Sequence, residues 1–267
     1  MSSRRLKYLL KSKSYRFVKD IKNKSHEINY INWNDKKVFY RASSSDMSLI
    51  YEILLKSKYK AEYFFPSFLK PKVIFDIGGN IGITSIYLAK QFPDAFIYTF
   101  EPVLENFEVL QKNIKEYKNI KAFNFGLGSR NGNFKVYMSS DYENYGGTSF
   151  FPDDEGNDSE KFITCEVKKI NDIIKEFSIE SIDIIKIDTE GAEYDILLNI
   201  QDKILKNTSW ITGELHGNRD FELINYLENL GFSLGVKKLI NNRLFMFHAG
   251  RTDVVSQLNR DDIKALK

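Results

Sequence analysis

Short apolar runs alternate with helical patterns along most of this chain, and the clearest unit begins at Val73-Ile74-Phe75-Asp76-Ile77. A turn containing Gly78, Gly79 and Gly82 follows this run, and a helical pattern extends over 82–91. β-branched and aromatic residues favour a strand, and glycines allow a sharp turn. The pattern predicts a strand, a tight turn and a helix whose first N–H groups face a ligand.

The strand-and-helix unit repeats after residue 91. Predicted strands cover 95–100, 120–125, 133–138, 162–168, 182–187 and 210–214, and predicted helices cover 103–117, 169–177, a segment from near Gly191, and 219–230. Two closing strands, 232–238 and 243–247, have no helix between them and indicate an antiparallel hairpin at the sheet edge. Repeated units of this kind predict an α/β fold with a mostly parallel sheet between two layers of helices.

The chain before residue 71 has another pattern. It contains a weakly helical basic segment, two short strands at 27–32 and 37–41, and Ser44-Ser45-Asp46 as a cap for an amphipathic helix over 46–56. We expect an N-terminal extension (1–70), a main domain (71–250) and a C-terminal tail (251–267). Polar, Gly-containing residues 139–160 interrupt the main domain and predict a lid, because long loops in compact domains often cover binding sites.

Composition narrows the class of protein. Of 267 residues, 42% are hydrophobic and 28% charged, which is ordinary for a soluble globular chain. No apolar run approaches the ~18 residues of a membrane span, no secretory signal is recognisable, and Cys165 is the single cysteine, so we expect a cytoplasmic protein.

The formal charge of +3 is unevenly distributed along the chain. Residues 1–24 carry nine Lys or Arg and one acid, whereas the remainder has a net charge of −5. An acidic main domain argues against a nucleic-acid partner. The basic arm is either a solvated tail or a contact for phosphates or an anionic membrane surface.

Polar residues recur where the predicted parallel strands end. In an open parallel sheet, ligands bind at this edge. The residues concerned are Asp76, Gly78 and Asn80 after the first strand, Glu101, then Asn124 and Phe125, then Asp188 and Glu190, and finally Glu214 and His216. The fold would gather these side chains along one edge.

The spacing Asp76-x-Gly78-x-Asn80-x-Gly82 departs from the G-x-G-x-x-G fingerprint of dinucleotide sites, because its third position falls on Ile83. It resembles instead the first motif of class I methyltransferases that use S-adenosylmethionine. Glu101, 19 residues after Gly82, is placed to accept hydrogen bonds from the ribose hydroxyls of either cofactor.

A second block makes the resemblance more specific. Residues 185–197, Ile-Lys-Ile-Asp-Thr-Glu-Gly-Ala-Glu-Tyr-Asp-Ile-Leu, resemble the K-x-D-x-E-G-x-E block of FkbM-type methyltransferases. Further segments similar to that family are Arg41 with Asp46, 100–102, 125–129, 146–149 and 213–217. The resemblance covers roughly residues 38–250. It implies a class I Rossmann-like fold with a seven-stranded sheet, and O-methylation of sugars, polysaccharide precursors or glycosylated natural products.

The resemblance also implies a cofactor site. We expect its residues to be Asp76, Gly78, Asn80, Thr84, Glu101, Asn124, Phe125 and Asp188. A sugar hydroxyl is a poor nucleophile and needs a base or a metal ion. Asp188, Glu214 and His216 suit Mg²⁺ or Mn²⁺. Two alternatives stay open: His216 as a metal-free base held by Asp188 or Glu214, and a purely structural polar network.

Lys186 completes the expected catalytic set with Asp188 and His216, either steadying a carboxylate or forming a structural ion pair. The expected function is S-adenosylmethionine-dependent O-methylation of a carbohydrate, such as a sugar nucleotide or a precursor of capsule or another surface glycan. The alternatives are an NAD-dependent oxidoreductase of a nucleotide sugar and a non-catalytic binding module. The amphipathic helix 46–56 is consistent with a homodimer.

Overall fold

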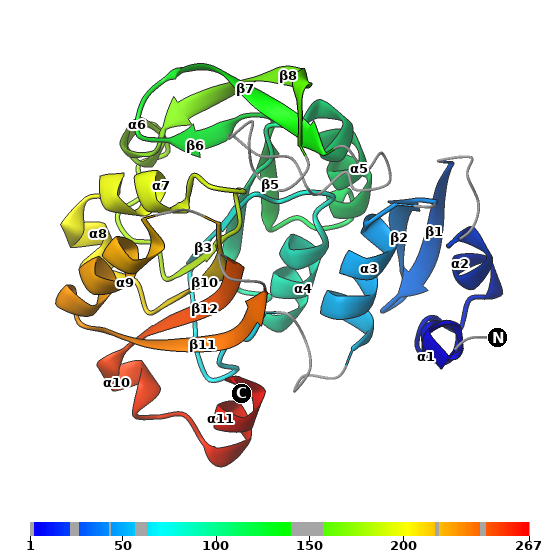
Figure 1. Cartoon of the computed structure of the whole chain (residues 1–267). Helices are drawn as coiled ribbons and strands as arrows, with labels where there is room; N and C mark the ends of the chain where they lie inside the picture. Colours follow the sequence, from blue (N-terminus) through cyan, green and yellow to red (C-terminus); the bar gives the residue numbers. More distant parts are fainter. Residues whose placement is uncertain are drawn as a thin grey trace.

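The computed structural model describes residues 3–21, 27–42, 44–56, 63–139, 157–216, 219–240 and 244–266. A seven-stranded sheet runs through its centre (Figure 1). From one edge to the other, its strands are β11 (Phe232–Ile240), β12 (Leu244–Arg251), β10 (Trp210–Leu215), β9 (Ile184–Ile187), β3 (Val73–Ile77), β4 (Phe96–Phe100) and β5 (Ile120–Phe123). Neighbours from β10 to β5 are parallel, and β12 is antiparallel to both β10 and β11. The predicted fold class, mostly parallel with an antiparallel hairpin, is confirmed.

Strand order explains where a ligand can bind. From β3 the chain continues to β4 and β5 on one side, and it later returns to β9 and β10 on the other side. The order therefore reverses between β3 and β9. A crevice forms at the carboxyl ends of the strands at such a point, because the loops leave in opposite directions.

Helices cover both faces of the sheet, which explains why its strands are almost continuously apolar. They are α4 (Ile83–Gln91), α5 (Leu104–Ile114), α6 (Ile170–Glu176), α7 (Glu193–Asn199), α8 (Asp202–Asn207) and α9 (Asp220–Asn229). Successive residues of a strand point to opposite faces. Ile74 and Ile184 accordingly belong to one buried cluster, and Phe75 and Ile185 belong to the other.

A second sheet of three strands lies over the carboxyl-end loops and was not predicted. It consists of β6 (Gly126–Gly128), β8 (Asn157–Lys169) and β7 (Gly132–Ser139), in that order. β6 is parallel to β8, and β7 is antiparallel to it. The two ends of the expected lid, 139 and 157–160, are therefore strand, and its interior, 140–156, lies outside the described residues.

The first 70 residues pack against the main domain rather than forming a core of their own. They contain α1 (Ser3–Ser12), α2 (Tyr15–Asp20), β1 (Ile28–Trp33), β2 (Lys36–Arg41), α3 (Asp46–Ile50) and a π-helical turn, η1 (Tyr51–Leu55). Asn34 and Asp35, both with positive φ, form the β1–β2 turn. Phe17 and Tyr40 share a buried cluster with Ile86 of α4.

The expected C-terminal tail is also ordered. It forms α10 (Thr252–Val255) and α11 (Arg260–Leu266), and Ala265 is fully buried. No helix in the described part of the chain is long and apolar enough to cross a membrane.

Asn113 of α5 joins the extension to the main domain. Its side-chain oxygen accepts from the Phe39 N–H at 2.6 Å, and its amide donates to the Phe39 carbonyl at 3.1 Å and to the Ile81 carbonyl at 2.7 Å. Asn113 is buried. One side chain therefore satisfies backbone groups of strand β2 and of the glycine turn.

Replacing Asn113 with Leu leaves three backbone groups without these partners. Because an unsatisfied buried polar group costs about 1–3 kcal/mol, we expect Asn113→Leu to lower the free energy of unfolding by about 2–4 kcal/mol, measured by urea denaturation. Asn207→Leu is the control, since Asn207 is exposed and bonds only the Lys203 carbonyl of its own helix. A loss at Asn113 no larger than at Asn207 would contradict the linking role.

Candidate active site

The glycine turn after β3 is held tightly between its neighbours. Gly78 has φ +77°, and the N–H groups of Gly78 and Gly79 both donate to the Phe100 carbonyl at the end of β4. On the other side, a Cβ atom added to Gly78 would lie 1.8 Å from the Asp188 carbonyl oxygen. Only glycine fits here, because both the φ angle and the contact exclude a side chain.

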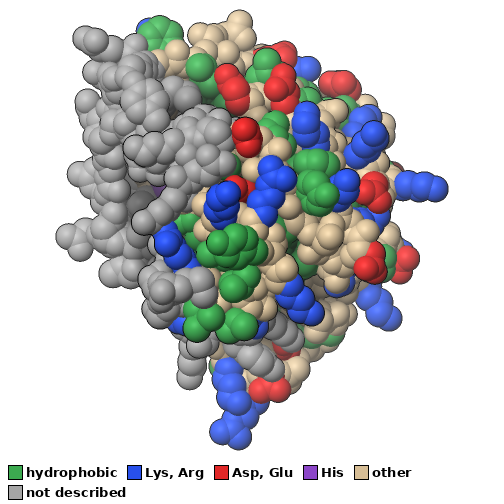
Figure 2. Space-filling model, turned by 90° about the vertical axis from the view of Figure 1, so that its right-hand side faces the viewer, with side chains coloured by type: hydrophobic (Ala, Val, Ile, Leu, Met, Phe, Trp, Pro, Cys, Tyr) green, Lys and Arg blue, Asp and Glu red, His purple; other side chains and the backbone are tan. Residues whose placement is uncertain are grey.

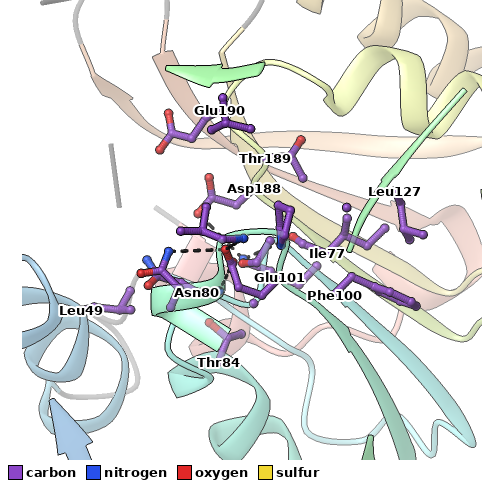
Figure 3. Close-up of a pocket in the computed structure, with 18 of the residues that line it drawn as sticks. Leu49, Ile77, Asn80, Thr84, Phe100, Glu101, Leu127, Asp188, Thr189 and Glu190 are labelled. Atoms are coloured by element: carbon purple, nitrogen blue, oxygen red, sulfur yellow. Dashed lines mark hydrogen bonds and ion pairs between the residues drawn. The ribbon is translucent and has the colours of Figure 1, made fainter. Parts of the chain in front are cut away.

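A pocket opens above this turn (Figure 3). The expected cofactor residues Gly78, Asn80, Thr84, Glu101 and Asp188 line it. Further lining residues, which were not among the expected cofactor residues, are Leu49, Tyr63, Phe100, Val103, Asn106, Leu127, Val136 and Thr189. In Figure 3 Asn80 and Glu101 lie between Thr84 on one side and the Asp188–Glu190 loop on the other. The pocket therefore spans the carboxyl ends of β3, β4 and β9.

Glu101 is bound firmly in the pocket wall. Its Oε2 accepts from the Asn80 N–H at 2.7 Å, and its Oε1 accepts from the Val103 N–H at 2.9 Å and from Asn106 Nδ2 at 3.4 Å. Burial raises the pKa of Glu101, and the two backbone N–H groups oppose that rise. A carboxylate has about four acceptor positions, so one remains for a ligand.

A buried ion pair of the N-terminal extension supports Glu101 from behind. Arg41 donates to both carboxylate oxygens of Asp46 at 2.8 Å, and its Nη2 also donates to Asn106 Oδ1 at 2.9 Å. Arg41 and Asp46 are 6% and 1% exposed. The family-like pair noted in the sequence thus fixes Asn106, which in turn contacts Glu101.

Lys186 lines the pocket, whereas Asp76, one of the expected cofactor residues, lies beneath Lys186 and does not line the pocket. Asp76 is fully buried, accepts a hydrogen bond from Ser85, and lies 3.5 Å from Lys186 Nζ. Lys186 donates to the Gly78 carbonyl at 2.6 Å and lies 3.9 Å from Asp188 Oδ2. Burial would lower the pKa of Lys186, but the charges of Asp76 and Asp188 outweigh it and raise that pKa. The ammonium group therefore joins the ends of β3 and β9.

Besides Asp76, two further expected cofactor residues do not line the pocket, Asn124 and Phe125. The Asn124 amide donates to the carbonyls of Glu101 and Pro102, at 3.0 and 3.1 Å. The ring of Phe125 packs on Phe100 and Phe123 in the core. The predicted strand 120–125 ends at Phe123, so the residues that follow turn away, and Gly126 and Leu127 line the pocket instead.

Beside the pocket, four carboxylates surround His216. Its Nδ1 lies 3.2 Å from Glu193 Oε1, and its Nε2 lies 3.3 Å from Glu214, 3.4 Å from Glu190 and 4.0 Å from Asp188. Burial favours the neutral ring, but hydrogen bonds to Glu193 and Glu214 and the other carboxylates raise the pKa of His216 to about 12. The expected trio of Asp188, Glu214 and His216 is brought together.

Glu193, which the sequence did not single out, is the most firmly held acid of this cluster. It is 1% exposed and accepts from the N–H groups of Thr189, at 2.7 Å, and Gly191, at 3.0 Å. Burial alone would raise its pKa, but the hydrogen bond and charge of His216 and these N–H groups hold the pKa of Glu193 below its usual value. Asp188, Glu193 and His216 each offer a ligand atom, all within 4.8 Å of one another.

Asp188 and Glu190 belong to both the pocket and the cluster. Asp188 Oδ2 accepts from the Tyr63 hydroxyl at 2.8 Å. Burial raises the pKa of Asp188, and Lys186 and Tyr63 oppose this rise. Burial also raises the pKa of Glu190, and the nearby carboxylates of Asp188, Glu193 and Glu214 add to that rise, so the pKa of Glu190 lies well above its usual value. Glu190 also has φ +56°, an unusual angle for a non-glycine residue. The Asp188–Glu190 loop thus combines an unusual backbone angle with closely spaced acidic groups.

Comparison with known proteins agrees with this fold. The model of the methyltransferase FkbM domain matches residues 76–234, more than half of the chain, and the chain therefore belongs to the FkbM methyltransferase family. Its sheet order and glycine turn are those expected of a class I methyltransferase.

Several curated proteins are similar. "Methyltransferase sdnD" of Sordaria araneosa is 27% identical over 194 residues, which is 60% of this chain and 73% of that protein. The 2-O-methyltransferase NoeI of Sinorhizobium fredii is 26% identical over 144 residues, or 50% of this chain and 59% of that protein. The AMB antimetabolite synthetase AmbE of Pseudomonas aeruginosa is 26% identical over 55% of this chain, but only 8% of that protein is spanned.

Among solved structures, the chain is similar to a putative methyltransferase from Streptococcus mutans in complex with SAH. The TM-score is 0.42 and the identity 12%, with 68% of this chain and 89% of that chain covered. Because this score is low, the fold assignment rests on the strand order and the family match.

The close contact at Gly78 can be tested by substitution. A methyl group there must displace the Asp188 backbone and adopt a left-handed φ, so we expect Gly78→Ala to lower the free energy of unfolding by at least about 2 kcal/mol in urea denaturation. Gly235→Ala is the control, because a Cβ at Gly235 meets nothing within 4 Å. An equal change in the free energy of unfolding in the two variants would contradict the tight packing of β3 against β9.

Proposed function

We propose that this protein is an S-adenosylmethionine-dependent O-methyltransferase that methylates a carbohydrate hydroxyl, for example in a sugar nucleotide or a polysaccharide precursor. The observation that carries the proposal is the double role of Asp188 and Glu190. They line the pocket and also border the His216 cluster. A methyl donor in the pocket would therefore lie next to the groups able to activate an acceptor.

The pocket fits the proposed donor. S-adenosylmethionine would supply a methyl group on a sulfonium, which is a good leaving group, so the protein chiefly has to position the two partners. Glu101 retains about one acceptor position for a ribose hydroxyl. Recognition of a second hydroxyl would require Asn106 to give up its long contact of 3.4 Å. The apolar side chains of Phe100 and Leu127 offer a surface for an adenine ring.

The cluster fits a divalent cation. It has four carboxyl groups around one imidazole, so a cation would find several oxygen donors there besides the His216 ring. Oxygen donors with one imidazole suit Mg²⁺ or Mn²⁺. Asp188, Glu193 and His216 would hold the ion, with Glu214 close by, and the ion would lower the pKa of a bound acceptor hydroxyl. The metal-free alternative, with His216 as the base, is disfavoured, because the raised pKa of His216 keeps its ring protonated near neutral pH.

Other buried groups take positioning roles in this proposal. Lys186 contacts the glycine turn and two aspartates, and Tyr63 donates to Asp188, so both fix the side chain that faces the acceptor. Asp76 holds Lys186 from below. We therefore assign Lys186 to positioning rather than to direct proton transfer.

One relative supports O-methylation, and the family resemblance supports a sugar as the acceptor. NoeI is named a 2-O-methyltransferase, so at least one similar protein transfers a methyl group to oxygen. The NAD-dependent oxidoreductase alternative gains no support from the family match or from the spacing of the glycine turn. Screening nucleotide sugars with labelled S-adenosylmethionine, with and without Mg²⁺ or Mn²⁺, tests the acceptor class.

Cofactor binding can be tested with Glu101. We expect the protein to bind S-adenosylhomocysteine and not NAD in calorimetry. Glu101→Gln should weaken that binding about 10–100-fold, because a charge-assisted hydrogen bond to the ligand is lost. Glu105→Gln, on the exposed first turn of α5, is the matched control and should bind normally. Tight binding of NAD would instead favour the oxidoreductase.

The metal proposal has a readout that does not depend on knowing the acceptor. Mn²⁺ should bind in calorimetry and raise the unfolding midpoint, since a ligand that binds the folded state stabilises it. Glu193→Gln should weaken this binding by at least about 10–100-fold, whereas Glu228→Gln, on the exposed side of α9, should not. Absence of Mn²⁺ binding, together with methyl transfer that survives EDTA, would leave the metal-free base.

A further inference from the structure

The outer face of the N-terminal extension combines exposed apolar side chains with an excess of positive charge. Within the described residues, the large apolar side chains exposed in its first 30 positions are Leu6, Leu10, Tyr15, Ile28 and Tyr30. Half of all large exposed apolar side chains in the described chain thus lie in this short segment. They come from α1, α2 and β1, which form one side of the molecule (Figure 1).

Helix α1 carries apolar residues on two opposite sides. Tyr8, only 3% exposed, packs inward and stacks on Tyr51 with ring centroids 4.3 Å apart. Leu6 and Leu10, one turn apart, are 46% and 67% exposed. At 100° per residue they lie opposite Tyr8, so they contribute nothing to the packing of α1 on the core.

Basic residues flank this apolar ridge. Lys7 and Lys11 lie beside Leu6 and Leu10 on α1, and all four are exposed. The next exposed cations along the chain are Lys13, Arg16 and Lys19, and Lys37 extends over the Tyr30 ring, 4.4 Å from its centroid. Figure 2 shows this side of the molecule, where Lys and Arg side chains surround exposed hydrophobic ones.

Acidic groups do little to neutralise the face. In the described residues 3–33, the acids are Asp20 and Glu27. Asp20 is 3% exposed and is bound by Asn29, by the Tyr40 hydroxyl and by Arg16 at 3.9 Å. Glu27, at the start of β1, is the exposed acid. A strongly positive field therefore covers the exposed leucines and tyrosines.

We propose that this face docks on an anionic lipid bilayer. A partner for this face must offer negative charge to the lysine ammonium groups. It must also offer an apolar region that can take up the side chains of Leu6 and Leu10. A bilayer with anionic headgroups offers both, and exposed Tyr side chains suit the interface between headgroups and acyl chains. A nucleic-acid backbone would satisfy the cations but leave the aliphatic side chains in water. This proposal is independent of the methyl-transfer proposal.

Sedimentation of the full-length chain with vesicles tests this docking. We expect binding to phosphatidylcholine vesicles that contain phosphatidylglycerol, much weaker binding to phosphatidylcholine alone, and a loss on raising the salt concentration. Lys7→Gln with Lys11→Gln should weaken binding about 30-fold, since each cation at the surface contributes about fivefold. Leu6→Ser with Leu10→Ser should weaken it about tenfold or more, and lowering the salt should not restore it.

The control exchanges a cation and an exposed apolar residue elsewhere, Lys203→Gln with Ile263→Ser, and should bind vesicles like the unmodified chain. All these positions are exposed, so unchanged thermal unfolding confirms that each variant folds. Equal binding to neutral and anionic vesicles, or normal binding by the leucine variant, would overturn the proposal. Tighter binding to a single-stranded RNA that depends on the lysines but not on the leucines would assign the face to a nucleic acid instead.

Discussion

The active-site edge depends on one buried cation. Lys186 donates to the Gly78 carbonyl and lies within ion-pair distance of Asp76 below it and Asp188 beside it. These groups belong to the two strands where the sheet order reverses. Without a positive charge there, the buried carboxylate of Asp76, the partly buried carboxylate of Asp188 and a carbonyl oxygen would face one another in a medium that screens them poorly. The ammonium therefore allows β3 and β9 to present acidic groups at a single point.

From that point the site extends in two directions. Toward β4, the glycine turn brings Asn80 to Glu101, and Arg41 and Asn106 hold the carboxylate in place from behind. Toward β10, the Asp188–Glu190 loop brings acids to His216. On the β4 side, Glu101 forms part of the pocket wall with its hydrogen-bond acceptor oxygens held in place. On the β10 side, acidic residues cluster around His216. The two share a boundary, which is what a reaction between a bound donor and an activated acceptor requires.

Much of the main domain could be predicted because its strands are short apolar runs that end in turn residues. Strand 73–77 matches β3, and the acids at the ends of β4, β9 and β10 converge as expected. Asn124 and Phe125 were misplaced because the chain bends after Phe123, and local pattern does not report a bend that tertiary packing imposes. Tyr63 follows residues with no periodic signal, so its bond to Asp188 could not be inferred.

Glu193 is a different case, because its signal was present. It is the last acid of the K-x-D-x-E-G-x-E block, but the predicted helix begins near Gly191, so its spacing indicated the first turn of a helix. In the structure it begins α7 and also accepts from the N–H groups of the preceding loop and contacts His216. A residue in two roles at once is hard to assign from spacing alone.

The N-terminal extension packs on the main domain with one face and exposes the opposite face. Its inner side supplies Leu49 and Tyr63 to the pocket and Arg41 to the support of Glu101, so it has to remain fixed on the main domain. Shared burial of Phe17 and Tyr40 with α4 achieves this. Because the inner side packs on the core, Leu6, Lys7, Leu10 and Lys11 of α1 are exposed and available for another surface. A partner bound to α1 would therefore leave the contacts of Leu49, Tyr63 and Arg41 with the main domain in place.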